Sequence, residues 1–175
     1  QLSRCIPPEQ RPVVFIGPYE HHSNDLPWRE SICELVTIGE DPDGRMDLAH
    51  LEVELVRHQS RPLRIGSFSA ASNVTGMLTP VHEIAALLHA HGAIACFDYA
   101  ASAPYVDIDM NPPPGRYPGD ASLDAVFISP HKFLGGPGST GVLVFNRRVY
   151  HSELPPSVSA GGTVDYVGPD GQDFI

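Results

Sequence analysis

Residues 63–97 constrain the fold more than any other part of the 175-residue chain. An apolar segment at 63–68 predicts a strand, and Thr79 and Pro80 are then expected as the N-cap and first residue of a helix. Gly92 ends that helix, and the apolar residues 93–97 predict a second buried strand. A strand, a helix and a strand joined by short loops make a right-handed crossover, so the two strands should lie parallel in one sheet.

Other apolar segments supply the rest of this sheet. Strands are predicted at 13–17, 32–38 and 124–129, and a helix is predicted at 47–58. Residues 141–145 form the last strand, and only about eleven residues separate it from the strand before it. Because a helical crossover needs about a dozen residues or more, that strand should be antiparallel. The predicted fold class is therefore α/β, a three-layer α/β/α arrangement with a mostly parallel sheet and one antiparallel strand.

The composition argues against two kinds of partner. The net charge of −10 argues against nucleic acid, because phosphate contacts need clustered lysine and arginine. No apolar run approaches the roughly 20 residues that cross a bilayer, and the first residues show no signal-peptide pattern, so we expect no membrane partner. Three cysteines with no CxxC spacing favour a reducing, cytoplasmic location, and Cys96, inside an apolar run, should be a buried and inert thiol.

Lys132 is the only lysine in the chain. It follows the predicted strand at 124–129 and precedes a glycine-rich turn at 135–138. A lysine amine that is desolvated in such a place can act as a nucleophile and form a Schiff base with a carbonyl. The alternative is an ordinary lysine at the end of a strand, whose amine extends to water.

Several polar residues are expected to gather at one edge of the sheet, because each follows a predicted parallel strand. They are His21, Asn73, Asp98, Ser129, His131 and Lys132. Open α/β sheets bind ligands at the carboxyl ends of their strands. Taken singly, Asp98 has an alternative interpretation as a turn residue, Asn73 as part of an Asx-turn, and His21 as a surface histidine.

Taken together, these residue types indicate a site for pyridoxal 5'-phosphate. An aldehyde cofactor held by Lys132 needs a carboxylate at its ring nitrogen, and Asp98 suits that role. His21 or His22 could stack on the flat ring. The cofactor's phosphate requires hydroxyl, imidazole or backbone N–H donors, which the residues after the strand at 124–129 could supply.

Four motifs within residues 13–165 carry a family resemblance. They are Glu-His-His-Ser-Asn at 20–24 with Pro-Trp at 27–28, Ser-Asn-Val-Thr-Gly at 72–76, Asp-Tyr-Ala at 98–100, and Ser-Pro-His-Lys at 129–132. With these motifs the chain resembles the class V aminotransferases, pyridoxal-phosphate enzymes of fold type I, and within them the cysteine desulfurase and selenocysteine lyase branch. The resemblance implies a transferase or lyase acting on an amino acid.

The resemblance also implies a role for each matched residue. Lys132 would form the aldimine and shuttle a proton, His21 would stack on the ring, and Asp98 would pair with the ring nitrogen. Further cofactor contacts are implied for four residues, Asn73, Ala100, Ser129 and His131. One position departs from the pattern, because desulfurases usually have glutamine three positions after the aspartate and this chain has Ala101.

Thr163 follows two glycines and resembles a residue that reaches the phosphate of the neighbouring subunit. This implies a homodimer with shared active sites. The family's phosphate-binding loop and its small C-terminal domain have no counterpart in this sequence. We therefore expect residues 1–165 to be the central part of a larger cofactor-binding domain, and residues 166–175 to be a tail that leads to a further domain.

Two other functions are considered. The chain could be a catalytically inactive binding or assembly module that keeps the fold without turnover. It could also hold a metal through four histidines, His21, His22, His89 and His91. His-His and His-Ala-His are not typical zinc spacings, and residues two apart on a helix point to different faces, so His89 and His91 are instead expected on the surface.

Overall fold

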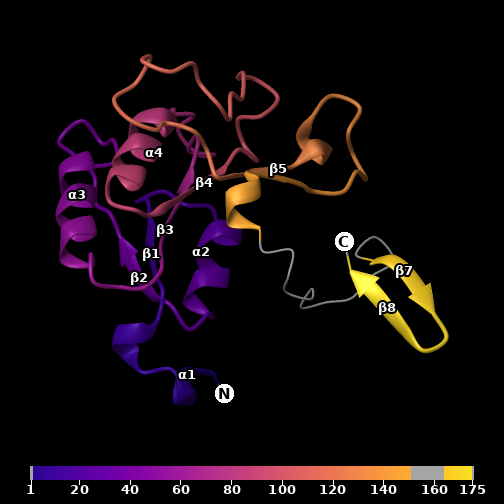
Figure 1. Cartoon of the computed structure of the whole chain (residues 1–175). Helices are drawn as coiled ribbons and strands as arrows, with labels where there is room; N and C mark the ends of the chain where they lie inside the picture. Colours follow the sequence, from indigo (N-terminus) through magenta and orange to yellow (C-terminus); the bar gives the residue numbers. More distant parts are fainter. Residues whose placement is uncertain (1, 151–163, 175) are drawn as a thin grey trace. The chain divides into compact units, whose positions relative to one another are not determined.

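The computed structural model describes residues 2–150 and 164–174, which divide into two compact units, 1–145 and 146–175 (Figure 1). The first unit contains a six-stranded sheet in the order β2-β1-β3-β4-β5-β6. Its strands are β1 (Val13–Ile16), β2 (Glu34–Thr37), β3 (Arg64–Ser69), β4 (Ile94–Asp98), β5 (Ala125–Ile128) and β6 (Val142–Phe145). Its helices and helical turns are α1 (Leu2–Cys5), η1 (Pro8–Gln10), α2 (His22–Arg29), α3 (Leu48–Arg57), α4 (Val81–Ala90) and η2 (Pro130–Lys132).

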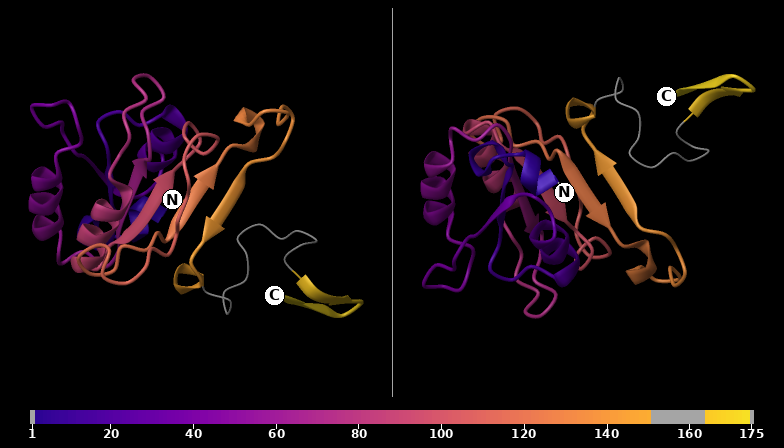
Figure 2. Two further views of the ribbon diagram at one scale, coloured as in Figure 1. Left: turned by 90° about the horizontal axis from the view of Figure 1, so that it is seen from above. Right: turned by 90° about the horizontal axis from the view of Figure 1, so that it is seen from below.

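The strand directions in this six-stranded sheet agree with the prediction of a mostly parallel sheet with one antiparallel strand. Strands β1 to β5 pair in parallel, whereas β6 runs antiparallel to β5 with Ile128 opposite Val142. The two views of Figure 2 show β5 and β6 as opposed arrows joined by the glycine-rich loop. β2 and β6 are the outer strands of this sheet, and all four residues of β6 are exposed.

Both faces of the central strands are covered, which explains why β1 is buried along its whole length. In β3, Gly66 faces α4, because a Cβ atom added there would lie 2.5 Å from a Leu88 methyl carbon. The next residue, Ser67, points to the opposite face and its Oγ donates a hydrogen bond to Asn24 Oδ1 of α2 at 2.6 Å. Figure 1 shows α3 and α4 on one side of the sheet and α2 on the other, so the three-layer prediction is confirmed.

The predicted start of α4 is wrong, whereas the start of α3 is as expected. Asp47 caps α3, since its Oδ1 accepts the His50 N–H at 3.0 Å. In α4 the N-cap is Pro80, which makes no side-chain capping bond. The Thr79 hydroxyl is buried and donates to the Ser69 carbonyl at 2.6 Å instead. Thr79 therefore fixes the loop after β3 rather than the end of the helix.

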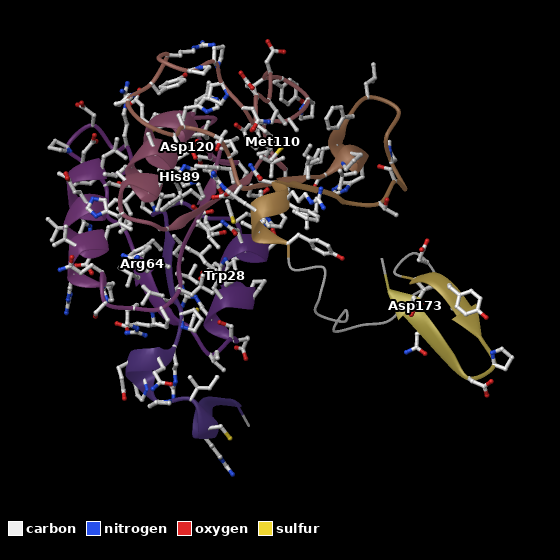
Figure 3. All side chains as sticks on the ribbon, viewed as in Figure 1. Trp28, Arg64, His89, Met110, Asp120 and Asp173 are labelled. Atoms are coloured by element: carbon white, nitrogen blue, oxygen red, sulfur yellow. The ribbon has the colours of Figure 1, made fainter. Side chains whose placement is uncertain are left out.

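His89 is not a surface residue as predicted, because it binds the long segment between β4 and β5. Its Nε2 lies 2.8 Å from Asp124 Oδ2, and its Nδ1 lies 2.8 Å from the Asp120 carbonyl oxygen (Figure 3). Asp124 is only 1% exposed and also accepts the Ala95 N–H at 2.8 Å. One buried carboxylate thus joins the end of α4, the start of β4 and the residue before β5.

The second unit contains the helical turn η3 (Arg147–Val149) and a hairpin of β7 (Val164–Gly168) and β8 (Gly171–Phe174). The sequence was expected to have no element after Gly168, and this is wrong. Pro169 and Asp170 form the turn between two short strands, and both are common turn residues. In the described parts of the chain, no helix is both long enough and apolar enough to cross a membrane.

Cys96 is expected to resist alkylation. Burial, followed by the charge of Asp124, raises the pKa of its thiol to about 12 from 9.0. At pH 8 the reactive thiolate is then about a thousandfold rarer than in an ordinary cysteine. Iodoacetamide should label the exposed Cys5 first and Cys96 at least ~100-fold more slowly, as followed by peptide mass spectrometry. Equal rates in the folded chain would contradict this, and urea should make the rates similar.

Candidate active site

The ends of the parallel strands lie side by side. In the sheet register Ser69 is opposite Asp98, and Asp98 is opposite Phe127. The loops that follow β1, β3, β4 and β5 therefore leave the sheet at the same edge. All the predicted site residues described by the structure lie in or next to these loops.

His21 lies between β1 and α2 and is the N-cap of α2. Its Nδ1 accepts the Ser23 N–H at 3.3 Å and lies 2.8 Å from the Ser23 hydroxyl oxygen. The imidazole is exposed, but these two contacts hold one of its nitrogens toward the helix.

Asp98 is the last residue of β4 and is 9% exposed. Its Oδ1 accepts the Ala100 N–H at 2.8 Å, which fixes the carboxylate at the strand end. Asn73 is exposed in the loop after β3, where Ser72 Oγ accepts the N–H groups of Val74 and Thr75 at 3.2 Å each.

Lys132 ends the helical turn η2, directly after β5. The Lys132 N–H donates to the Ser129 carbonyl at 2.9 Å, and the Gly136 N–H donates to the Phe133 carbonyl at 2.9 Å. No side chain fits at Gly136, because a Cβ atom there would lie 1.9 Å from the Pro130 carbonyl oxygen. The lysine was expected to be desolvated, but its side chain is exposed in this chain, and so is that of His131.

A cavity of about 70 Å³, here called the first cavity, brings most of the predicted residues together. It is lined by His21, Ser69, Ala71, Asn73, Asp98, Ala100, Ala101 and Lys132. Five of these eight residues were predicted from the sequence. They come from the ends of three strands and from the lysine turn, so the predicted meeting at one edge is realised in the structure.

A second cavity, of about 400 Å³, shares Asp98 and Ala100 with the first. Its remaining lining residues are Ser23, Asn24, Pro27, Trp28, Phe127 and Ser129. Ser129 and Asp98 thus line the same cavity. His131 lines neither cavity, and Thr163 lies outside the described residues.

A polar network beneath His21 was missed by the sequence analysis. The Glu20 carboxylate accepts hydrogen bonds from the Gly17 N–H (3.1 Å), the Ser69 N–H (2.9 Å), the Ser69 hydroxyl (2.7 Å) and the Asn24 amide (2.6 Å). Asn24 is buried and also donates to the Ser67 carbonyl at 3.1 Å. The sequence did contain one sign of this network. Ser67 and Ser69 lie two residues apart in β3, so their side chains share a face, and two polar side chains in a predicted buried strand indicate a polar partner on that face.

The metal hypothesis has little geometric support. Within residues 2–150 and 164–174, no three histidine, cysteine, aspartate or glutamate side chains lie where they could hold one ion. His21 and His22 have ring centroids 5.6 Å apart, but His89 is engaged with Asp120 and Asp124.

Comparison with known proteins relates the whole chain to one family. The family model of class V aminotransferases matches residues 4–174. A probable cysteine desulfurase of Halalkalibacterium halodurans is 31% identical over 159 residues, which are 89% of this chain and 36% of that protein. A cysteine desulfurase of Shigella sonnei is 32% identical over 158 residues, or 86% of this chain and 35% of that protein.

A solved structure shares the fold as well. The apo structure of a cysteine desulfurase from Thermococcus onnurineus superposes with a TM-score of 0.72 at 26% identity, covering 99% of this chain and 40% of that one. The chain thus spans little more than a third of the length of the relatives that it matches.

Glu20→Gln should destabilise the fold, because an amide NH₂ group would face donors that the carboxylate now accepts from. We expect a loss of about 1–3 kcal/mol in the free energy of unfolding, measured by urea denaturation. Glu30→Gln, at an exposed position directly after α2, is the control and should change it by less than ~0.5 kcal/mol. Equal effects of the two substitutions would show that the network contributes nothing.

Proposed function

Because this chain belongs to the class V aminotransferase family, we propose that it is part of a pyridoxal-phosphate-dependent enzyme that acts on an amino acid as a transferase or lyase. The observation that supports this most directly is the first cavity. There the chain's only lysine, Lys132, and the buried carboxylate of Asp98 line the same space as the imidazole of His21.

The residues at the sheet edge fit pyridoxal phosphate chemically. A protonated ring nitrogen needs a carboxylate shielded from water, and Asp98 is such a group. A flat ring needs a planar group on one face and a small residue on the other, and His21 and Ala100 line the same cavity. When bound, the cofactor supplies an electron sink that stabilises negative charge at the substrate's α-carbon.

Asp98 would keep the ring nitrogen protonated. Because the Asp98 side chain is buried, its attraction for a cation is screened less than at the surface. The Ala100 N–H holds Oδ1, so the carboxylate is already oriented before the ligand arrives. No side chain has to reorganise to make this ion pair.

Lys132 would have two roles. Its Nζ would be the amine that holds the cofactor, and the same amine could take a proton from the substrate's α-carbon and return it. The loop is built for a fixed position, since η2 and the turn at Gly136 hold the backbone on both sides of the lysine. Asn73 and Ser129 would add contacts to the cofactor or the substrate.

We further propose a homodimer with shared sites, and a reducing compartment such as the cytoplasm. The exposed side chains of His21, Asn73 and Lys132 support the first proposal, because a working site excludes water and something must cover them. The relatives are about two and a half times as long as this chain, so further polypeptide or a second subunit can supply that cover. The three free cysteines favour the second.

The names of the relatives favour removal of sulfur from cysteine as the reaction. The lining of the first cavity does not favour sulfur removal in particular, because the small residue Ala101 stands where a larger polar side chain could contact the cofactor. The proposal is therefore limited to an amino-acid substrate that reacts at its α-carbon.

Lys132 is expected to be the residue that binds the cofactor covalently. The full natural polypeptide that contains this chain should develop a visible absorption band with pyridoxal phosphate, and Lys132→Ala should abolish it. After borohydride reduction, trypsin cannot cleave at a modified lysine. Mass spectrometry should then find one peptide of residues 117–147 in place of 117–132 and 133–147. No band in the natural polypeptide, or a label on another lysine, would refute the proposal.

Asp98→Asn should leave the cofactor bound but slow catalysis. An amide cannot hold the ring nitrogen protonated, so we expect kcat to fall by on the order of 100-fold or more. Asp107→Asn, at an exposed position in the segment after β4, is the control and should retain normal activity. Normal kcat in Asp98→Asn would remove the assigned role.

A further inference from the structure

A third cavity, of about 410 Å³, opens beside Lys132. It is lined by Ala71, Ser72, Asn73, Gly76, Leu78, Ala101, Ser102, Tyr105, Val106 and Lys132. Four of these residues also line the first cavity, so the two spaces adjoin at the lysine. Its volume lies in the range of about 300–1,000 Å³ in which small-molecule sites occur.

Ser102 in this cavity lacks a hydrogen-bond partner. Among the described residues, its Oγ is one of only two buried side-chain N or O atoms without one, the other being Nε of Arg64. Ser102 is 4% exposed, and burying a hydroxyl without a partner is costly. Because Ser102 lines the cavity, its hydroxyl is a candidate hydrogen-bond partner for a ligand there.

The rest of the lining sets the size and charge of such a ligand. Ala71 and Ala101 have small side chains, and a Cβ atom added at Gly76 would meet nothing within 4 Å. Under the proposed function the Lys132 amine is engaged at the reacting centre, and the other lining residues carry no ionisable group that is charged at neutral pH, so a charged side chain would have no counterion there. Tyr105 also lines this cavity and is 82% exposed, so it lies at the opening of the cavity to solvent.

We propose that the third cavity receives the side chain of the amino-acid substrate, and that this side chain is neutral, larger than that of cysteine, and carries a group that hydrogen-bonds to Ser102. This inference rests on the proposed function, because it places the reacting α-carbon at Lys132. Ser102 and Ala101 then determine specificity, Ser102 through its hydroxyl and Ala101 through the space that it leaves.

Three amino acids serve as probes: L-alanine, L-leucine and L-asparagine. Leucine and asparagine have nearly the same shape but differ in polarity, whereas alanine does not reach the cavity. Each is titrated into the full natural polypeptide loaded with pyridoxal phosphate, and the dissociation constant is read from the change in the visible spectrum. Asparagine is expected to bind about tenfold more tightly than leucine, because only asparagine can pair with a buried hydroxyl.

Two variants test the two specificity residues. Ser102→Ala should bring asparagine and leucine to within about twofold of each other. Ala101→Leu should weaken both by about tenfold or more and should weaken alanine less, because the added side chain takes space from the third cavity as well as from the first cavity, which Ala101 also lines. Ala49→Leu, at an exposed position on α3, makes the same substitution elsewhere and should change none of the three constants.

Thermal unfolding separates this proposal from a purely structural role of Ser102. Removing an unpaired buried hydroxyl should leave the melting temperature of Ser102→Ala unchanged or raise it. A lower melting temperature with the preference for asparagine retained would overturn the proposal, and so would alanine, leucine and asparagine binding equally to the natural protein. Failure of the cofactor band to appear would instead refute the proposed function.

Discussion

The Glu20 carboxylate is the interaction on which the arrangement of the site depends. Its four hydrogen bonds join the residue after β1, the last residue of β3 and the first turn of α2. Gly17 has no room for a side chain, because a Cβ atom there would lie 2.7 Å from Glu20 Oε1. His21 is the next residue along the chain, so its backbone position follows from this one group. Two strands and a helix are thus fixed in register where the ligand is expected.

A second carboxylate, the buried Asp124, plays the corresponding role at the opposite end of β4. Asp124 accepts from the Ala95 backbone and contacts His89, so the long segment between β4 and β5 is held at its end. More than twenty irregular residues connect the strand that carries Asp98 to the strand that leads to Lys132. Without Asp124, these contacts at the end of that segment would be lost. The direct pairing of β4 with β5, in which Asp98 lies opposite Phe127, sets the distance between these two site residues, and Asp124 holds the long segment that joins the two strands.

The sequence predicted those features that depend on local patterns. Apolar runs marked the strands, and the short link before residues 141–145 predicted the antiparallel partner correctly. Because parallel strands end together, His21, Asn73, Asp98 and Lys132 could be expected to meet. Helix α2 was missed because it has few buried residues and contains Pro27. The bonds from Glu20 to Ser69 and from His89 to Asp120 and Asp124 reach partners 31 to 49 residues away, and no local periodicity reveals them. The exposure of Lys132 could not be predicted either, since it depends on what else covers this edge of the sheet.

The exposed strand β6 has a consequence for handling the molecule. Its four apolar residues, Val-Leu-Val-Phe, are exposed on both faces of the last strand in the sheet. Such a strand offers backbone donors and acceptors to any extended segment that approaches, and natural proteins usually protect such edges with charges or with a covering element. In concentrated solution this chain by itself would therefore grow by edge-to-edge strand addition into insoluble aggregates. Its solubility would be controlled by β6 long before its thermal stability became limiting.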